Sequence, residues 1–306
     1  MALPARRAGT AASSESTETI ATLLGGFSLE ATFPSAAEIE ALKKSAPAGT
    51  RIYLSCPPNH SAEKLVEYAV NVRNAGFEPV PHLTARAYPD RATLDSVLSQ
   101  LTREAAVRSV LAIAGDRDDV AGPFEGALAL IESGSLEAHG ITEVDISGYP
   151  DGHPKIDNKV LEDAMAKKLP ALVRRKLAVN ITTQFCFEPD LILAWIRRIR
   201  ASGIDVPLRV GVAGPTSLRA LMRLALRCGV RASVRGAMNP KTMQLFGDAT
   251  PDEIIRALAE AEDRAQLGNI TVHFFSFGGL VATSDWAVAV AEERITPTAN
   301  GFRVIK

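Results

Sequence analysis

The sequence predicts an α/β protein built as one (β/α)8 barrel. Short apolar runs alternate with amphipathic helical stretches from residue 27 to residue 290, and such alternation indicates a parallel sheet. Eight repeats over about 260 residues match a closed barrel better than an open doubly wound sheet. The open sheet is the alternative, because periodicity alone cannot close a barrel.

The predicted strands are short and nearly continuous in apolar residues. Val110–Ile113 is typical, and this pattern is expected of strands that are covered on both faces. The eight candidate strands, in chain order, are Phe27–Thr32, Arg51–Ser55, Pro79–Thr84, Ser109–Ala114, Glu143–Gly148, Ala178–Phe185, Leu208–Val212 and Ile270–Phe275.

Helix signals stand between these strands. Pro189 occupies a first-turn position before an amphipathic stretch that ends near Gly203. Thr250–Glu253 reads as a capping box with proline at the first helical position, and it predicts a helix that ends near Gly268. A further helical stretch, Val230–Leu245, lies between strands seven and eight.

The beginning of the chain differs from the rest in composition. Residues 1–20 are rich in Ala, Ser, Thr and Arg. Small and polar residues follow Arg6 and Arg7, where a signal peptide needs an apolar stretch. We therefore expect residues 1–20 to be a disordered tail and residues 21–306 to form a single barrel domain.

Composition and charge exclude several classes of function. The formal net charge is −1, from 34 basic and 35 acidic residues, and no basic run is present, so nucleic acid is not an expected partner. No apolar run approaches the roughly 18 residues of a membrane helix. Cys56, Cys186 and Cys228 are far apart and odd in number, which gives no disulfide framework or metal spacing. We expect a cytoplasmic protein without a metal site.

Polar residues near the carboxyl ends of the predicted strands are the candidates for chemistry, because active sites of barrels lie there. Glu30 is set in an apolar run, where a carboxylate is costly unless it is paired or protonated; an outward, solvated residue or an arginine partner is the alternative. Asp116 follows strand four as a site acid or a solvated loop acid. His82 and Gln184 can serve a ligand or simply be hydrogen-bonded in place.

The segment after strand five is the most informative loop. Gly148–Pro154 contains two glycines and two prolines, which fix an unusual backbone path. Tyr149 and His153 are placed on that path. The loop is either a rigid turn or one that shapes a ligand site with a ring and a hydrogen-bond donor.

Five short motifs resemble those of the methylenetetrahydrofolate reductases, and they occur in that family's order. Each is weak alone, but five in order are specific, and the resemblance covers roughly residues 25 to 290. The motifs are Ser28–Pro34, Pro81–Thr84, Gly115–Asp116, Gly148–Pro154 and Thr183–Phe185.

The resemblance implies a (β/α)8 barrel that converts 5,10-methylenetetrahydrofolate to 5-methyltetrahydrofolate, a small-molecule folate reaction. By resemblance, Glu30 is the acid that helps to open the five-membered ring. Asp116 holds the pterin and stabilises the charge that develops, and Gln184 and Phe185 also contact the substrate. Ring opening needs a proton on the leaving nitrogen, so we expect an apolar surrounding to raise the pKa of Glu30.

The resemblance also implies cofactor positions. Flavin-dependent members of the family hold FAD around the barrel mouth, and matched positions in this chain are His82, Thr84, Gly115, Tyr149 and His153.

Departures from the family pattern concern the flavin. Ala114 stands in place of an arginine, Ser55–Pro58 replaces Tyr-Gly-Ala, the lysine stretch before strand six is not recognisable, and Phe277–Gly279 replaces Leu-Asn-Arg. Several of these positions hold the flavin's diphosphate and sugar, and loss of charged clamps costs strong bonds. We therefore favour direct hydride transfer from NADH or NADPH without flavin.

Three other interpretations stay open at this point. The chain can be an ordinary FAD-dependent reductase, a pterin-dependent methyl- or demethylation enzyme on a similar barrel, or a folate-binding barrel without catalysis. An oligomer is possible, and the sequence does not choose between NADH and NADPH.

Overall fold

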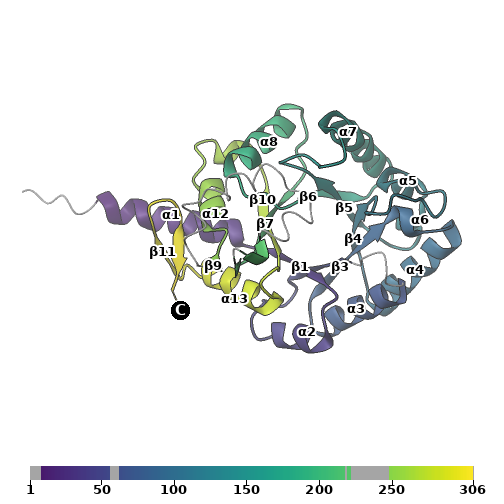
Figure 1. Cartoon of the computed structure of the whole chain (residues 1–306), viewed down its shortest axis with the longest axis horizontal. Helices are drawn as coiled ribbons and strands as arrows, with labels where there is room; N and C mark the ends of the chain where they lie inside the picture. The colour runs from purple at the N-terminus through teal and green to yellow at the C-terminus, as the bar shows by residue number, and fades with distance from the viewer. Residues whose placement is uncertain (1–7, 56–61, 218, 222–247, 306) are drawn as a thin grey trace, which may run out of the picture.

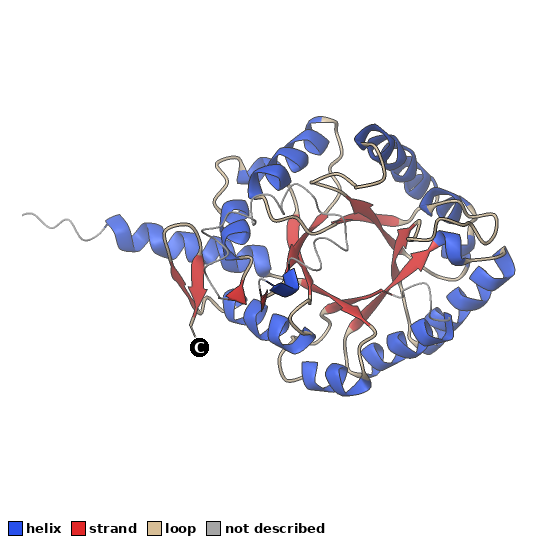
Figure 2. Cartoon of the chain, in the orientation of Figure 1, coloured by secondary structure: helices blue, strands red, loops and turns tan. Residues whose placement is uncertain are grey.

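Eight parallel strands close into a barrel that is surrounded by helices (Figures 1 and 2). The computed structural model describes residues 8–55, 62–217, 219–221 and 248–305. Neighbouring strands follow the order β1-β10-β7-β6-β5-β4-β3-β2 around the barrel, with parallel pairing throughout. The predicted fold class is confirmed. The helix predicted over Val230–Leu245 lies outside the described residues.

The barrel strands occupy the predicted runs, with small shifts at their ends. The largest shift concerns the sixth strand, which was expected to reach Phe185 but ends at Thr183, so that Gln184 and Phe185 lie in the loop that follows. The strands are β1 (Ser28–Thr32), β2 (Arg51–Ser55), β3 (Glu78–Thr84), β4 (Ser109–Ile113), β5 (Glu143–Gly148), β6 (Ala178–Thr183), β7 (Leu208–Ala213) and β10 (Ile270–Phe275).

Helices and two small antiparallel hairpins complete the described structure. The hairpins pair β8 (Thr216–Ser217) with β9 (Asp248–Ala249), and β11 (Ile295–Pro297) with β12 (Phe302–Val304). The α-helices are α1 (Ala8–Leu24), α2 (Ala36–Leu42), α3 (Ala62–Asn74), α4 (Arg91–Glu104), α5 (Ala127–Glu132), α6 (Ser135–Ala138), α7 (Asn158–Arg174), α8 (Pro189–Ala201), α12 (Asp252–Ala259) and α13 (Leu280–Ala291), with 3-10 turns at Ala85–Ala87 and Arg264–Leu267. No described helix is long and apolar enough to cross a membrane.

Two local predictions were wrong. Helix α12 begins after Pro251 and ends at Ala259, well before Gly268, and the capping box does not form, because the Thr250 hydroxyl donates to the Asp252 side chain. Residues 8–20, expected to be a disordered tail, belong to α1. Its last turns carry Ile20, Leu23 and Leu24, which are buried, and α1 packs on α12 and α13 (Figure 1). Apolar burial at one end of the segment therefore outweighs its polar composition.

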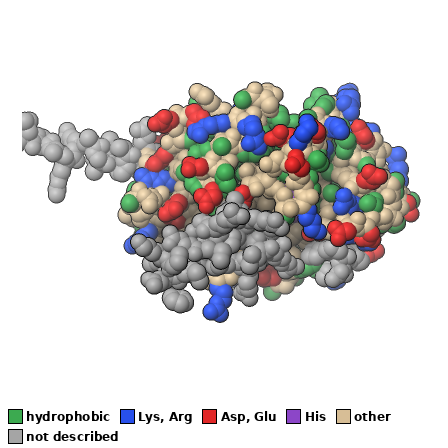
Figure 3. All heavy atoms as spheres, turned by 45° about the horizontal axis from the view of Figure 1, so that its top comes forward, with side chains coloured by type: hydrophobic (Ala, Val, Ile, Leu, Met, Phe, Trp, Pro, Cys, Tyr) green, Lys and Arg blue, Asp and Glu red, His purple; other side chains and the backbone are tan. Residues whose placement is uncertain are grey.

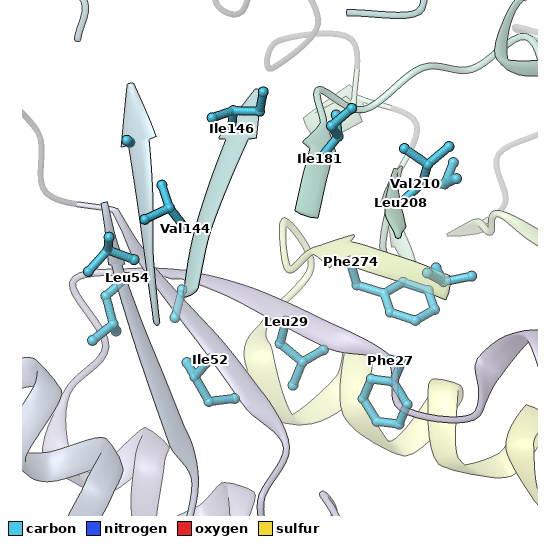
Figure 4. Packing of buried hydrophobic residues seen from close by; sticks show 14 of the residues in the cluster. Phe27, Leu29, Ile52, Leu54, Val144, Ile146, Ile181, Leu208, Val210 and Phe274 are labelled. Atoms are coloured by element: carbon cyan, nitrogen blue, oxygen red, sulfur yellow. The ribbon is translucent and has the colours of Figure 1, made fainter. Parts of the chain in front are cut away.

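The main core lies between the strands and the helices. Leu29, Ile52 and Phe274, drawn with their neighbours in Figure 4, belong to this apolar layer. Successive residues of a strand face opposite sides of the sheet. The strand residues that alternate with these core residues therefore face the barrel lumen. Many of these lumen residues are polar, and Glu30 and His273 are among them. The fold thus encloses polar side chains within an apolar shell.

Candidate active site

Glu30 lies on β1 at the upper part of the lumen, towards the carboxyl ends of the strands. Its Oε2 atom lies 3.4 Å from Nε2 of His273 on β10 and 3.6 Å from Nε2 of His82 on β3. The Glu30 side chain is 14% exposed and the two imidazoles are buried. The structure therefore places a nearly buried carboxyl between two buried histidines.

His273 is fixed by contacts on several sides. Its Nδ1 atom lies 2.9 Å from the hydroxyl of Ser28, two residues before Glu30 on the same face of β1. The ring packs edge-on against Tyr53 of β2, with centroids 4.5 Å apart. Tyr53 also lies edge-on to His82, at 6.3 Å. The imidazole of His273 is thereby held in one orientation.

The electrostatics of Glu30 differ from the expectation. Burial raises the pKa of Glu30, but the charges of His82 and His273 and hydrogen bonds from His273 and Ser55 together outweigh burial, so its pKa is lowered. Burial lowers the pKa of His82, although Glu30 opposes this. The predicted raised pKa of Glu30 was wrong, because the apolar neighbours in the sequence face the outer core, whereas histidines from distant strands face the carboxyl.

A second group of site residues follows β3, β4 and β5. Asp116 is exposed, and its charge raises the pKa of Tyr149, which burial raises more strongly. Burial lowers the pKa of His153, and Asp116 acts against that shift. The rings of Tyr149 and His153 meet edge-on, with centroids 5.5 Å apart. Asp116, Tyr149 and His153 therefore lie within electrostatic reach of one another.

Gly115 and Thr84 hold the base of this second group. Gly115 has φ +91°, a conformation that favours glycine. A Cβ atom added there would lie 3.1 Å from Cβ of Thr84. The two residues therefore pack closely together at the base of the loop that carries Asp116.

Gln184 lies just beyond β6 and uses its carbonyl locally. Its Oε1 atom accepts from the backbone N–H of Phe185 at 3.0 Å, and its own backbone N–H donates to the Gly148 carbonyl at 2.8 Å. Gly211 allows β7 to approach this turn, because a Cβ there would lie 2.3 Å from the Thr183 carbonyl oxygen. The side-chain amide of Gln184 is thus oriented with its NH2 group as the donor that can serve a ligand.

Phe185 belongs to an aromatic cluster that is separate from the main core. It is buried, and its ring centroid lies 5.1 Å from those of Phe275 and Phe277. The ring of Phe275 in turn lies 5.1 Å from His273. The cluster connects Phe185 with the Glu30 group, so Phe185 lines the same part of the lumen.

The lower lumen contains a buried polar network that the sequence analysis missed. Asp145 of β5 accepts hydrogen bonds from the Tyr53 hydroxyl, from Thr182 at 2.7 Å and from Asn180 at 2.9 Å. Asn180 also donates to Glu143, at 2.8 Å. Glu143 is bound in turn by both terminal nitrogens of the Arg51 guanidinium, and Nε of Arg209 lies 4.0 Å from Asp145.

Sequence reasoning also missed His273 and Ser28. Asp145 could have been found by the signal that found Glu30, an acid inside an apolar strand. No local signal could have paired Ser28 with His273, because they lie 245 positions apart in the chain. Only the register between the first and last barrel strands brings them together.

The fit of a flavin can be tested at the loop after β4. Asp116, Asp118 and Asp119 are exposed there, and Arg117 pairs with Asp119 and Lys155 with Asp118. The loop is therefore acidic, which is the property that bears on a cofactor carrying a diphosphate. In the part of the chain that the structure describes, no three His, Cys, Asp or Glu side chains gather as a metal site. Acidic and basic side chains are interspersed on the face in Figure 3.

A closed (β/α)8 barrel with a carboxyl, two histidines and an amide near the carboxyl ends of its strands has the site architecture of a barrel enzyme. The chain belongs to the methylenetetrahydrofolate reductase family, whose family model matches residues 39–239. The resemblance inferred from the five motifs is confirmed. Glu30 and His273 lie outside the matched residues, whereas Asp116 and Gln184 lie within them.

Curated relatives give the same family at low identity. Methylenetetrahydrofolate reductase 2 of Saccharomyces cerevisiae is 28% identical over 177 residues, which are 55% of this chain and 28% of that protein. Methylenetetrahydrofolate reductase (NADH) 1 of Arabidopsis thaliana is 24% identical over 196 residues, 59% of this chain and 33% of that protein. The 5,10-methylenetetrahydrofolate reductase of Pectobacterium carotovorum subsp. carotovorum is 25% identical over 198 residues, 60% of this chain and 62% of that protein. The match thus spans less than two thirds of each of these relatives.

Among solved structures, dihydropteroate synthase from Thermus thermophilus aligns with a TM-score of 0.48 and 14% identity, over 87% of this chain and 92% of that one.

Proposed function

We propose that this protein reduces 5,10-methylenetetrahydrofolate to 5-methyltetrahydrofolate in the cytoplasm, with NADH or NADPH as the direct hydride donor and without flavin. The observation that carries the proposal is the Glu30 carboxyl, held between His82 and His273 in the barrel of a member of this family. A buried acid–imidazole group at the active end of a barrel suits a reaction that begins with proton delivery.

Each site residue has a role in this reaction. Glu30 supplies the proton that the leaving nitrogen needs when the five-membered ring opens to an iminium. Asp116, an exposed carboxylate beside Tyr149, stabilises the positive charge of the iminium. Gln184 donates its amide NH2 group to the pterin, because its carbonyl is already used by Phe185.

The proposed hydride donor rests on the names of the relatives and on the acidic residues at the mouth of the barrel. Plant relatives carry NADH in their names, which supports NADH over NADPH. The acidic loop after β4 supports a reaction without resident FAD, because a resident cofactor must stay bound through many turnovers. A nicotinamide that binds and leaves in each cycle needs a much weaker hold. His82, Thr84, Gly115, Tyr149 and His153, proposed as flavin positions by resemblance, are then free to line the nicotinamide site.

The proposal is tested with purified protein, 5,10-methylenetetrahydrofolate and NADH or NADPH. We expect a colourless protein that consumes reduced nicotinamide and forms 5-methyltetrahydrofolate, with no increase in rate when FAD is added. A flavin spectrum near one per chain would instead establish the FAD-dependent reductase. Folate binding without turnover would establish the non-catalytic barrel, and methyl transfer to or from another substrate without nicotinamide oxidation would establish the methyltransfer enzyme.

Steady-state kinetics test the same proposal independently. Without a flavin the hydride cannot be stored, so both substrates must be bound together, with reacting atoms about 3–3.5 Å apart. Double-reciprocal plots at several folate concentrations should intersect. Parallel lines, with release of oxidised nicotinamide before folate is added, would contradict direct transfer.

A further inference from the structure

The position of His273 raises a question about the proton that Glu30 delivers. The pKa of Glu30 is lowered by the two histidines, which disfavours the protonated carboxyl that the reaction needs. Both histidines approach the same oxygen, Oε2, at 3.4 Å for His273 and 3.6 Å for His82. A proton held by one of these imidazoles is therefore within one transfer of the carboxyl.

The two histidines differ in how they are held. His273 contacts polar groups at both ring nitrogens, Ser28 at Nδ1 and Glu30 at Nε2. Ser28 pairs with His273 in the register between β1 and β10, and it lies on the same face of β1 as Glu30. By contrast, Nε2 of His82 is buried and makes no hydrogen bond with the described residues. Only His273 is bridged between two residues of β1.

The other groups around His273 leave its proton no competing partner. Tyr53 presents its ring to His273 and commits its hydroxyl to Asp145. Phe275 covers another side of the imidazole. His82 faces Glu30. Asp145 and Arg209 lie deeper in the lumen, where Nε of Arg209 is 4.0 Å from the Asp145 carboxylate. Among the described residues, the polar partners of the His273 ring nitrogens are thus Ser28 and Glu30.

We propose that His273, oriented by Ser28, is the positioning residue of Glu30 and holds the proton that Glu30 delivers; this inference rests on the proposed reductase function. A proton first passes from Nε2 of His273 to the Glu30 carboxylate, 3.4 Å away. As the substrate ring opens, the carbon–nitrogen bond pair passes to nitrogen, and nitrogen takes this proton from Glu30. His273 is left neutral and regains a proton from solvent after the product leaves.

The experiment compares His273→Gln and Ser28→Ala with a matched control. Glutamine keeps an N–H donor near Glu30 but cannot give up a proton as an acid. His139→Gln is the control, because His139 also faces a carboxylate, Asp95 at 3.3 Å, but lies outside the lumen.

For His273→Gln we expect kcat to fall about tenfold or more, while KM for folate changes less than about threefold. The alkaline limb of the kcat profile should move to lower pH, because a lone carboxyl holds its proton less firmly than the pair. Ser28→Ala should shift it in the same direction by less.

A second measurement needs no turnover. Histidine labelled with 13C at Cε1 gives one NMR signal for each of the five histidines, and the His273 signal is identified by its loss in His273→Gln. Its chemical shift should change in Glu30→Gln, because the carboxylate that lies 3.4 Å from Nε2 is replaced by an amide. The same substitution should leave the His139 signal in place.

The possible results separate the inference from the proposed function. If the parent protein is an active reductase and His273→Gln keeps kcat and the pH profile within about twofold, the inference is overturned. An unchanged His273 signal in Glu30→Gln overturns it as well. If the parent protein lacks reductase activity, the proposed function fails, and the NMR comparison alone decides whether Glu30 and His273 interact. Should His273→Gln fail to fold, Ser28→Ala removes a single hydrogen bond and gives the same readouts.

Discussion

The lower and the upper lumen of the barrel hold buried charges in opposite ways. In the lower lumen, Asp145 accepts from three side chains and Glu143 is bound by Arg51. In the upper lumen, Glu30 meets two histidines at longer distances, and Nε2 of His82 makes no hydrogen bond with the described residues. A satisfied network fixes one structure, whereas incomplete pairing leaves protons able to move. We therefore propose that the lower lumen serves stability and that the upper lumen serves the proposed chemistry.

The largest expected effect comes from breaking the lower network. Asp145→Ala removes the buried acceptor of the Tyr53 and Thr182 hydroxyls, and it leaves Asn180 with Glu143 alone. We expect a loss of about 3–5 kcal/mol in the free energy of unfolding, measured by urea denaturation. Asp163→Ala, at an exposed position of α7, should stay within about 0.5 kcal/mol. A small loss for Asp145→Ala would mean that the network is not a stabilising element.

The next effect tests the upper lumen, where activity rather than stability should be lost. Glu30→Gln keeps the shape of the side chain and removes its proton. We expect turnover to fall about 10²-fold or more, with a thermal midpoint close to that of the parent. The control is Glu67→Gln, since Glu67 forms an exposed pair with Lys64. Near-normal turnover in Glu30→Gln would remove Glu30 from the mechanism.

A buried charge outside the lumen sharpens the comparison. Lys168 of α7 is 8% exposed, and burial lowers its pKa to about 8. Because the folded pKa lies below the ordinary value of 10.5, the charged lysine destabilises the fold at neutral pH, and stability recovers as pH rises from about 8 to 10.5. Lys168→Met should stabilise the protein by about 1–3 kcal/mol at pH 7 and remove this recovery. Equal stability of the two proteins at pH 7 would contradict a desolvated lysine.

The smallest expected effect concerns His82. The pKa of Glu30 and that of His82 are both lowered in the fold, so each contributes stability that is present above its ordinary value and lost as pH falls. His82→Gln should therefore flatten the fall in thermal midpoint between about pH 6.5 and pH 4. An unchanged pH dependence would show that His82 and Glu30 do not interact in the folded protein.

Local patterns predicted the barrel well, and the site in part. Strand runs such as Ser109–Ala114 are visible because apolar continuity is a local property. Glu30, Asp116 and Gln184 were found as polar residues near strand ends. The environment of Glu30 could not be predicted, because His82 and His273 come from other strands and reverse the direction of its pKa shift. The helical state of residues 8–20 depends on burial against α12 and α13, which composition does not reveal.

The pairing of β1 with β10 has a consequence for folding. Ser28, Glu30 and His273 lie on the two strands that are joined last in sequence order, at the seam where the barrel closes. Closing so long a loop is entropically slow, and a chain that has not closed it lacks the proton-holding group altogether. If the proposed function holds, an incomplete barrel, during synthesis or after local opening at the seam, cannot carry out the reaction.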